Sequence, residues 1–119
     1  MSEYKLGLVE SRFADIIWQN EPLQSSELAK LALIELECKK STTYTVLKRL
    51  CDRGIFVNDG GTVKSLISKK DFYALQSEEV VNDSFSGSLP AFVAAFSSRK
   101  KLTEEEINQL QDMINKMRG

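Results

Sequence analysis

The sequence predicts a mainly α fold that carries one small β-hairpin. Three observations indicate this class. Apolar residues recur at helical spacing over residues 41–53, β-prone runs flank the Asp59-Gly60-Gly61 turn, and helical patterns with capping residues resume after Ser68. The 119 residues suffice for one domain with its own core, or for a smaller domain with an appendage.

The most informative stretch is the helix expected over residues 41–53. One side of this helix is apolar and should face a core; it holds Thr43, Val46, Leu47, Leu50 and Cys51. The other side is polar and holds Ser41, Tyr44, Thr45, Lys48 and Asp52, with Thr42 and Arg49 on its flanks. Hydroxyl groups and cations on an exposed helix suit phosphates and base edges in a DNA major groove. Gly54 then ends the helix.

Two further helices are expected ahead of this one. The first covers residues 8–20, ends at Pro22, and shows a helical stripe of apolar side chains, namely Leu6, Val9, Phe13, Ile16 and Ile17. Ser25 or Ser26 caps the second, which extends to about Glu35. Two short helices, a brief connection and a third helix with one polar face are the parts of a helix-turn-helix.

Residues 55–67 contain two β-prone runs around a turn of aspartate and two glycines, which predicts a hairpin. A hairpin directly after the third helix is the wing of a winged helix, where it can lie along the sugar-phosphate backbone. These elements define a DNA-binding domain over residues 1–68. Residues 69–119 then form a separate helical domain.

The helical domain is expected to hold three helices. The first begins after Ser68, the second has Ser88 as its cap and Pro90 in its first turn, and the third opens with a capping box over residues 103–106. An apolar stripe runs along the last two helices, formed by Phe92, Val93, Phe96, Ile107, Leu110, Ile114 and Met117. This stripe is either a core within the chain or an interface with a second copy. The interface is favoured, because twofold dimers are common and a twofold operator needs two readers.

The net charge of −1 conceals an uneven distribution. Residues 1–38 hold three basic and seven acidic side chains, residues 39–70 hold eight and two, and residues 71–119 hold five and eight. The positive charge therefore gathers around the third helix and the wing, where it provides the field that nucleic acid requires. We expect phosphate contacts from Lys39, Lys40 and Lys64, whereas Lys69 and Lys70 fit a solvated surface equally well.

Several other function classes find no support in the sequence. Histidine is absent and there are two cysteines, so a zinc site built from the usual nitrogen and sulfur ligands would be incomplete, and no metal or cofactor is expected. An inert thiol is favoured over a redox sensor at Cys38. No glycine-rich phosphate loop or evident carboxylate pair indicates an enzyme. No signal peptide or membrane-spanning run is present, which makes the cytoplasm the expected location.

Four motifs in this order resemble the penicillinase-repressor family, which includes the methicillin-resistance and copper-responsive repressors of bacteria. They are Ile16-Ile-Trp18 before Pro22, Ser41-Thr-Thr-Tyr-Thr-Val-Leu-Lys-Arg-Leu50 before Arg53-Gly54, Ser88-Leu-Pro-Ala-Phe-Val-Ala-Ala-Phe96, and Leu102-Thr-Glu-Glu-Glu-Ile107. The resemblance covers nearly the whole chain. It implies a homodimer with an N-terminal winged helix that binds a palindromic operator, and a C-terminal helical dimerisation arm.

The chain departs from the family pattern in places that bear on how a repressor is released. In antibiotic-responsive members a protease cuts before a phenylalanine, typically after an asparagine; the matching pair here is Ala95 and Phe96, a candidate release site that lacks the asparagine. Copper-responsive members carry a cysteine pattern at the C-terminus, which this chain lacks. Copper sensing by that route is therefore not expected.

We therefore expect a DNA-binding transcriptional repressor that acts as a homodimer through the helix at 41–53 and the wing at 55–67. The residues expected to contact DNA are Lys39, Lys40, Ser41, Thr42, Tyr44, Thr45, Lys48, Arg49 and Lys64. Two alternatives remain open. The polar side of residues 41–49 can be an ordinary solvated helix face, or the winged helix can serve protein contacts without DNA.

Overall fold

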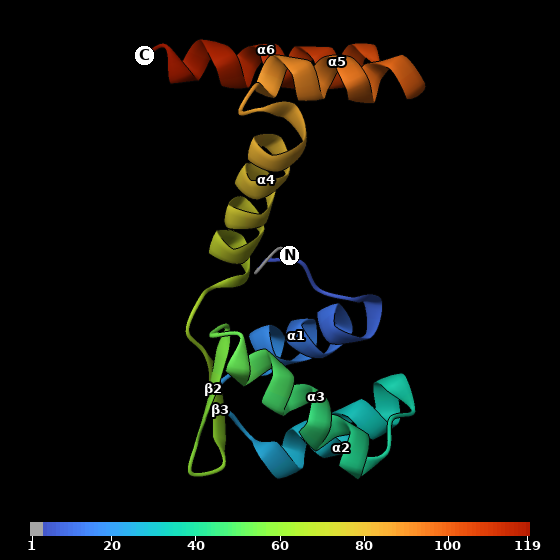
Figure 1. Cartoon of the computed structure of the whole chain (residues 1–119), viewed down its shortest axis with the longest axis vertical. Coiled ribbons are helices and arrows are strands. Elements are labelled where there is room, and N and C mark those ends of the chain that lie inside the picture. Colours follow the sequence, from blue (N-terminus) through green and yellow to red (C-terminus); the bar gives the residue numbers. More distant parts are fainter. Residues whose placement is uncertain (1–3) are drawn as a thin grey trace. The chain divides into compact units, whose positions relative to one another are not determined.

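The computed structural model describes residues 4–119, which divide into two compact units; the first ends at Glu79 and the second covers Val80–Gly119. Figure 1 shows the order of the elements along the chain. The first unit contains α1 (Leu8–Asn20), β1 (Leu23–Gln24), α2 (Ser25–Leu36), α3 (Lys40–Asp52), β2 (Phe56–Asp59) and β3 (Thr62–Ser65). The helix α4 (Lys69–Phe85) begins in the first unit and ends in the second, which also contains α5 (Leu89–Arg99) and α6 (Glu104–Met117). The prediction of a mainly α fold with a small hairpin is confirmed.

The core of the first unit lies between α1, α2, α3 and the sheet. Phe13 and Ile17 of α1, Leu28 of α2 and Leu50 of α3 are fully buried there. Thr43 is the one buried polar side chain among the described residues, and its hydroxyl donates to the carbonyl oxygen of Lys39 at 3.2 Å. This bond removes the free-energy cost of an unpaired hydroxyl, so α3 can bury a complete side.

The sheet has three antiparallel strands in the order β1-β3-β2, one more than the sequence predicted. The added strand, β1, has only two residues, which pair Leu23 with Val63 and Gln24 with Thr62. A two-residue strand is too short to produce an alternating pattern in the sequence. At the hairpin turn Gly60 and Gly61 have φ angles of 58° and 100°, which glycine adopts without the steric strain of a side chain.

Two local expectations for the first helices are wrong. Val9 is 51% exposed, because α1 buries residues only from Phe13 onward and its first turn is held by polar contacts instead. The residue that caps α2 is Gln24 rather than a serine, because Gln24 is still extended by its pairing with β3 and the helix begins directly after it.

The first turns of α4 belong to the first unit. Phe72 is fully buried, with its ring 5.7 Å from the ring of Trp18 between centroids. The indole nitrogen of Trp18 donates to the carbonyl oxygen of Ile67 at 3.0 Å, just before α4 begins. Lys69 forms a 3.0 Å ion pair with Asp15 of α1. These contacts fix the start of α4 on the winged-helix core.

The second unit has well-defined helix caps and little buried surface. The hydroxyl of Ser88 accepts from the amide of Ala91 at 3.1 Å, as predicted. Thr103 and Glu106 form the predicted capping box, and the amide of Thr103 lowers the pKa of the Glu106 carboxyl. Neither α5 nor α6 contains a buried residue. The predicted apolar stripe therefore does not form an internal core among these helices.

The contrast between Leu28 and Leu33 on α2 tests this description of the core. Leu28 is fully buried and Leu33 is 59% exposed. We expect Leu28→Ala to lower the free energy of unfolding by about 2–5 kcal/mol, because it leaves a cavity. Leu33→Ala is the matched control and should change it by less than about 0.5 kcal/mol. Urea titrations at equal protein concentration measure both, and equal losses would contradict the assigned burial.

Candidate nucleic-acid interface

The two sides of α3 have opposite environments, as the sequence predicted. Thr43, Val46, Leu47 and Leu50 are buried, and the side chains of the other side are exposed, namely Lys40, Ser41, Thr42, Thr45, Lys48 and Arg49. Because the buried side packs on α1, α2 and β2, the exposed side is held in one fixed direction. The helix therefore presents cations and hydroxyls on a rigid support.

The hydroxyl-bearing residues of α3 differ in what they can offer a ligand. The hydroxyl of Thr45, an exposed residue, donates to the carbonyl oxygen of Ser41 at 3.0 Å, which leaves its oxygen free to accept. Tyr44 is half-buried against the core, and its hydroxyl lies 3.5 Å from that of Ser25. Tyr44 thus contacts the protein itself, unlike its exposed neighbours.

The N-terminus of α3 concentrates positive charge. Lys39 is the N-cap residue, Lys40 opens the helix, and the first turn holds no acidic side chain. A helix N-terminus carries a partial positive charge of its own, so two lysines there repel it. Lys39, Lys40, Lys48 and Arg49 form no ion pair within residues 4–119. Their charge therefore remains available to an anion.

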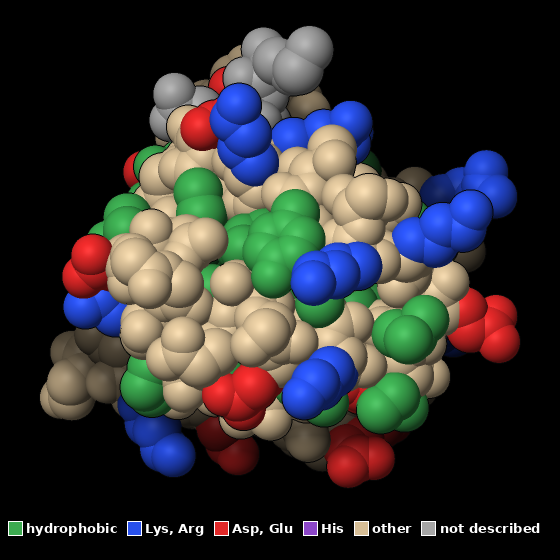
Figure 2. Space-filling model, turned by 90° about the horizontal axis from the view of Figure 1, so that it is seen from below, with side chains coloured by type: hydrophobic (Ala, Val, Ile, Leu, Met, Phe, Trp, Pro, Cys, Tyr) green, Lys and Arg blue, Asp and Glu red, His purple; other side chains and the backbone are tan. Residues whose placement is uncertain are grey.

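Figure 2 views the first unit from the side on which the hairpin turn, α2 and part of α3 lie in Figure 1. Lysine and arginine side chains are spread across this face, and the acidic side chains lie mostly toward its edge. Lys64 is exposed on β3, opposite Val57, and so adds a cation to the wing. Lys69 is different, because Asp15 binds its ammonium group and raises its pKa. The sequence left open whether Lys69 and Lys70 contact phosphates or lie on a solvated surface. Asp15 neutralises the charge of Lys69.

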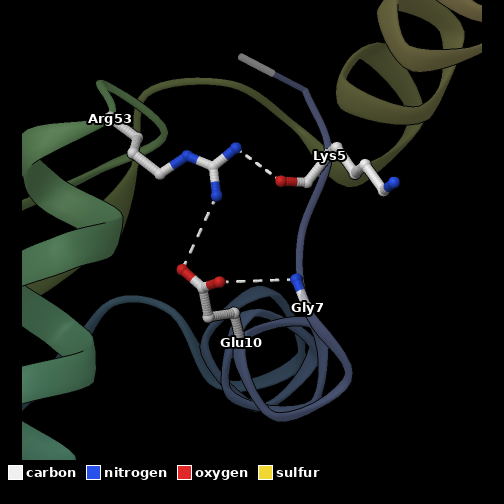
Figure 3. A network of polar contacts seen from close by, with 4 residues as sticks. All are labelled: Lys5, Gly7, Glu10 and Arg53. Carbon is white, nitrogen blue, oxygen red and sulfur yellow. Dashed lines mark hydrogen bonds and ion pairs between the residues drawn. The ribbon is translucent and has the colours of Figure 1, made fainter. Parts of the chain in front are cut away.

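Arg53 just after α3 takes part in a polar network that sequence reasoning missed. Figure 3 shows its guanidinium group between the N-terminal segment and α1. It forms a 3.6 Å ion pair with Glu10 and donates to the carbonyl oxygen of Lys5, while Glu10 also accepts from the amide of Gly7 at 3.3 Å. The network ties residues 5–10 to the end of α3. Its only trace in the sequence is the basic residue ahead of Gly54.

Other kinds of chemistry are sparsely represented. Burial raises the pKa of the Cys51 thiol, which keeps it protonated and unreactive at neutral pH. Over the part of the chain that the structure describes, no three His, Cys, Asp or Glu residues gather as a metal site. Within the same residues, no helix is both long and apolar enough to cross a membrane.

The second unit presents its apolar stripe to solvent. Phe96 is 46% exposed and Met117 is 78% exposed, and a groove of about 320 Å³ lies between α5 and α6, lined by Phe92, Leu110 and Met113 among others. The bond between Ala95 and Phe96 lies inside α5, so its backbone is helical in this structure. Exposed apolar stripes are typical of surfaces that bind another molecule.

Comparison with known proteins identifies the family. The family model for the penicillinase repressor matches residues 6–116. The chain belongs to the penicillinase repressor family. Among its curated relatives, the methicillin resistance regulatory protein MecI of Staphylococcus aureus strain Mu50 is 23% identical over 118 residues, 95% of each chain. MecI of Mammaliicoccus sciuri is 22% identical over the same length and coverage.

A solved structure supports the fold. The crystal structure of a multiple antibiotic-resistance repressor (MarR) from Listeria monocytogenes is similar over 97% of this chain and 74% of that chain, with a TM-score of 0.50 and 19% identity. The family confirms the expectation of a DNA-binding transcriptional repressor. The similar structure confirms the winged-helix fold. The exposed side of α3 is therefore the candidate DNA interface of this family member.

The lysines at the start of α3 should lower the stability of this repressor. We expect Lys40→Glu to raise the free energy of unfolding by about 0.3–1 kcal/mol, because a negative charge replaces a positive one at the positive end of the helix. Lys40→Gln removes the repulsion alone and should give a smaller gain. Urea unfolding at low ionic strength measures the difference, and a loss of stability in Lys40→Glu would show that the N-terminal field is not repulsive.

Proposed function

We propose that this chain represses transcription as a homodimer that binds a twofold operator in double-stranded DNA. In this proposal α3 enters the major groove and the β2–β3 hairpin lies along the adjacent backbone. The observation that carries it is the exposed side of α3, where unpaired cations and hydroxyls stand opposite a fully buried side. Such a helix can make phosphate contacts and read base edges without first rearranging.

The residues divide by the contacts their chemistry allows. Lys39, Lys40 and Lys64 are point charges suited to phosphates, and Arg49 and Lys48 suit either guanine or phosphate. Ser41 and Thr42 can donate to phosphate oxygens. Thr45 donates its hydroxyl hydrogen to Ser41 instead, and its methyl group can contact a thymine methyl. Tyr44 contributes its ring edge rather than its hydroxyl, which faces Ser25.

We further propose that the helical part of the chain holds two copies together, with residues 1–68 devoted to DNA and residues 69–119 to dimerisation, apart from the first turns of α4, which pack on the first unit. The apolar stripe on α5 and α6 supports this assignment, since it is exposed in the single chain. Two winged helices joined by a twofold axis would meet half-sites about one helical turn, 34–36 Å, apart. Cleavage between Ala95 and Phe96 would separate α6 from the DNA-binding unit and so dissolve the dimer.

Neutralising the exposed cations of α3 tests the DNA interface. We expect Lys48→Ala combined with Arg49→Ala to weaken operator binding by at least about 100-fold, and to lower the slope of log affinity against log salt by roughly 0.9 per lost phosphate contact. Lys116→Ala combined with Arg118→Ala removes the same charge from the far end of the chain and serves as the control. Titrations of fluorescent operator at several salt concentrations give both quantities. A winged helix that serves protein contacts alone would show no such loss.

A charge placed in the apolar stripe tests the dimer. We expect Ile114→Glu to shift the protein to a monomer, because a carboxylate cannot be buried in an apolar interface without a partner. Asn108→Glu adds the same charge to α6 outside the stripe and should leave the dimer intact. Sedimentation equilibrium over a range of concentrations reports the mass of each variant. The assigned interface is contradicted if both variants are monomers or if both are dimers.

A further inference from the structure

The wing is held along its length by the short segment between α1 and α2. Near the base of β3, the carboxylate of Glu21 accepts from both the amide and the hydroxyl of Ser65, at 2.8 and 2.7 Å, and its second oxygen lies 2.9 Å from the same hydroxyl. Farther along, β1 pairs with β3. At the hairpin turn, the amide of Ser25 donates to the carbonyl oxygen of Gly61 at 2.8 Å.

Side chains reinforce the backbone pairing near the turn. The amide group of Gln24 donates to the hydroxyl of Thr62 at 3.2 Å. The amide of Gly61 donates to the side chain of Asn58 at 3.0 Å, which closes the turn from within. Residues 21–25 thus contact β3 at its base, its middle and its tip.

The same segment also contacts the candidate recognition helix. Ser25 is the first residue of α2, which packs on α3, and its hydroxyl accepts from Tyr44 of α3 at 3.5 Å. Its backbone amide is the group that binds the hairpin turn. Ser25 therefore connects the wing tip and α3 through two different atoms.

The hairpin consists of two four-residue strands, and Phe56 and Val63 anchor them in the core. Its outer part, from Asn58 to Gly60, is exposed and has little reason to keep one orientation by itself. Contacts with a separate strap that is anchored on the helical core remove this freedom. A wing fixed in advance loses less conformational entropy when a ligand binds it.

We propose that residues 21–25 form a clamp that fixes the wing relative to α3 before DNA arrives, with Glu21 as its principal positioning residue. The proposal rests on the proposed function, because it concerns how the wing cation Lys64 reaches the DNA backbone. Glu21 itself touches no DNA. Its carboxylate acts through Ser65, which lies next to Lys64 on β3.

Whether removing the Glu21 carboxylate strengthens or weakens DNA binding distinguishes a positioning role from electrostatic repulsion of phosphates. Removing an acidic side chain from a DNA-binding unit should strengthen binding slightly, because it removes repulsion of phosphates. The clamp requires the opposite. Glu21→Ala should weaken binding about three- to tenfold, since a wing that is free to move loses its phosphate contact. Glu21→Gln keeps one acceptor oxygen for Ser65 and should retain most of the affinity.

The decisive experiment is a double-mutant cycle between Glu21 and Lys64 in the full chain, read by operator titrations across salt concentrations. Lys64→Ala alone should weaken binding and reduce the salt slope. In the Glu21→Ala background, Lys64→Ala should add almost nothing, because the wing is already displaced. Glu35→Ala removes an exposed acid of α2 outside the clamp, and its cycle with Lys64 should be additive.

Each outcome decides the proposal. Additive effects of Glu21→Ala and Lys64→Ala, or tighter binding by Glu21→Ala, would overturn the clamp while leaving the proposed function intact. An unmutated chain without salt-dependent DNA binding would instead overturn the proposed function. If circular dichroism shows that Glu21→Ala fails to fold, the cycle is run with Ser65→Ala, which removes the hydroxyl donor alone; the same non-additivity supports the clamp and additivity refutes it.

Discussion

Burial of one side of α3 is the constraint on which the rest of the first unit depends. Val46, Leu47 and Leu50 fix both the position and the rotation of the helix, because each would lose its contacts if the helix turned. A helix with lysines at its N-terminus and no acid in the first turn is poorly stabilised by its own sequence. Tertiary packing supplies that stability instead. The exposed residues of α3 therefore do not need to stabilise the helix and can carry charges that suit a ligand.

The two units obtain their stability in different ways. The first encloses a core that includes Phe13, Phe56 and Phe72, so it has the parts of an independently folded domain. In the second, neither α5 nor α6 buries a residue, although their caps are well formed. Caps set where a helix begins, but a short helix needs an apolar partner to persist in water. In the proposed dimer, the order of the second unit would be coupled to association, and its stability would rise with protein concentration.

Much of the fold could be predicted because its signals are local. The spacing of Val46 and Leu50, the glycines of the hairpin and the capping box at Thr103 each act within a few residues. The features that were missed join residues far apart in the chain. Strand β1 exists only through β3, and the Arg53–Glu10 pair and the Tyr44–Ser25 contact follow from how the helices pack. The exposure of Val9 was mispredicted for the same reason. The spacing of apolar residues identifies one side of a helix, but it does not show which residues on that side the rest of the protein covers.

A net charge of −1 is compatible with a nucleic-acid interface because electrostatic fields in salt are short-ranged. At physiological ionic strength, charges on the surface are screened over about 8 Å, so acidic residues on other elements do little to cancel the lysines of α3. The low total charge has a benefit of its own. Affinity for random DNA grows with the number of phosphates that a protein neutralises, whereas selectivity is a ratio of affinities. In the proposed interface, the unpaired cations of α3 and the wing lie on the surface that also carries the hydroxyl groups of α3. A small total charge would then limit binding to unrelated sequences without removing the cations that the proposal places on the operator.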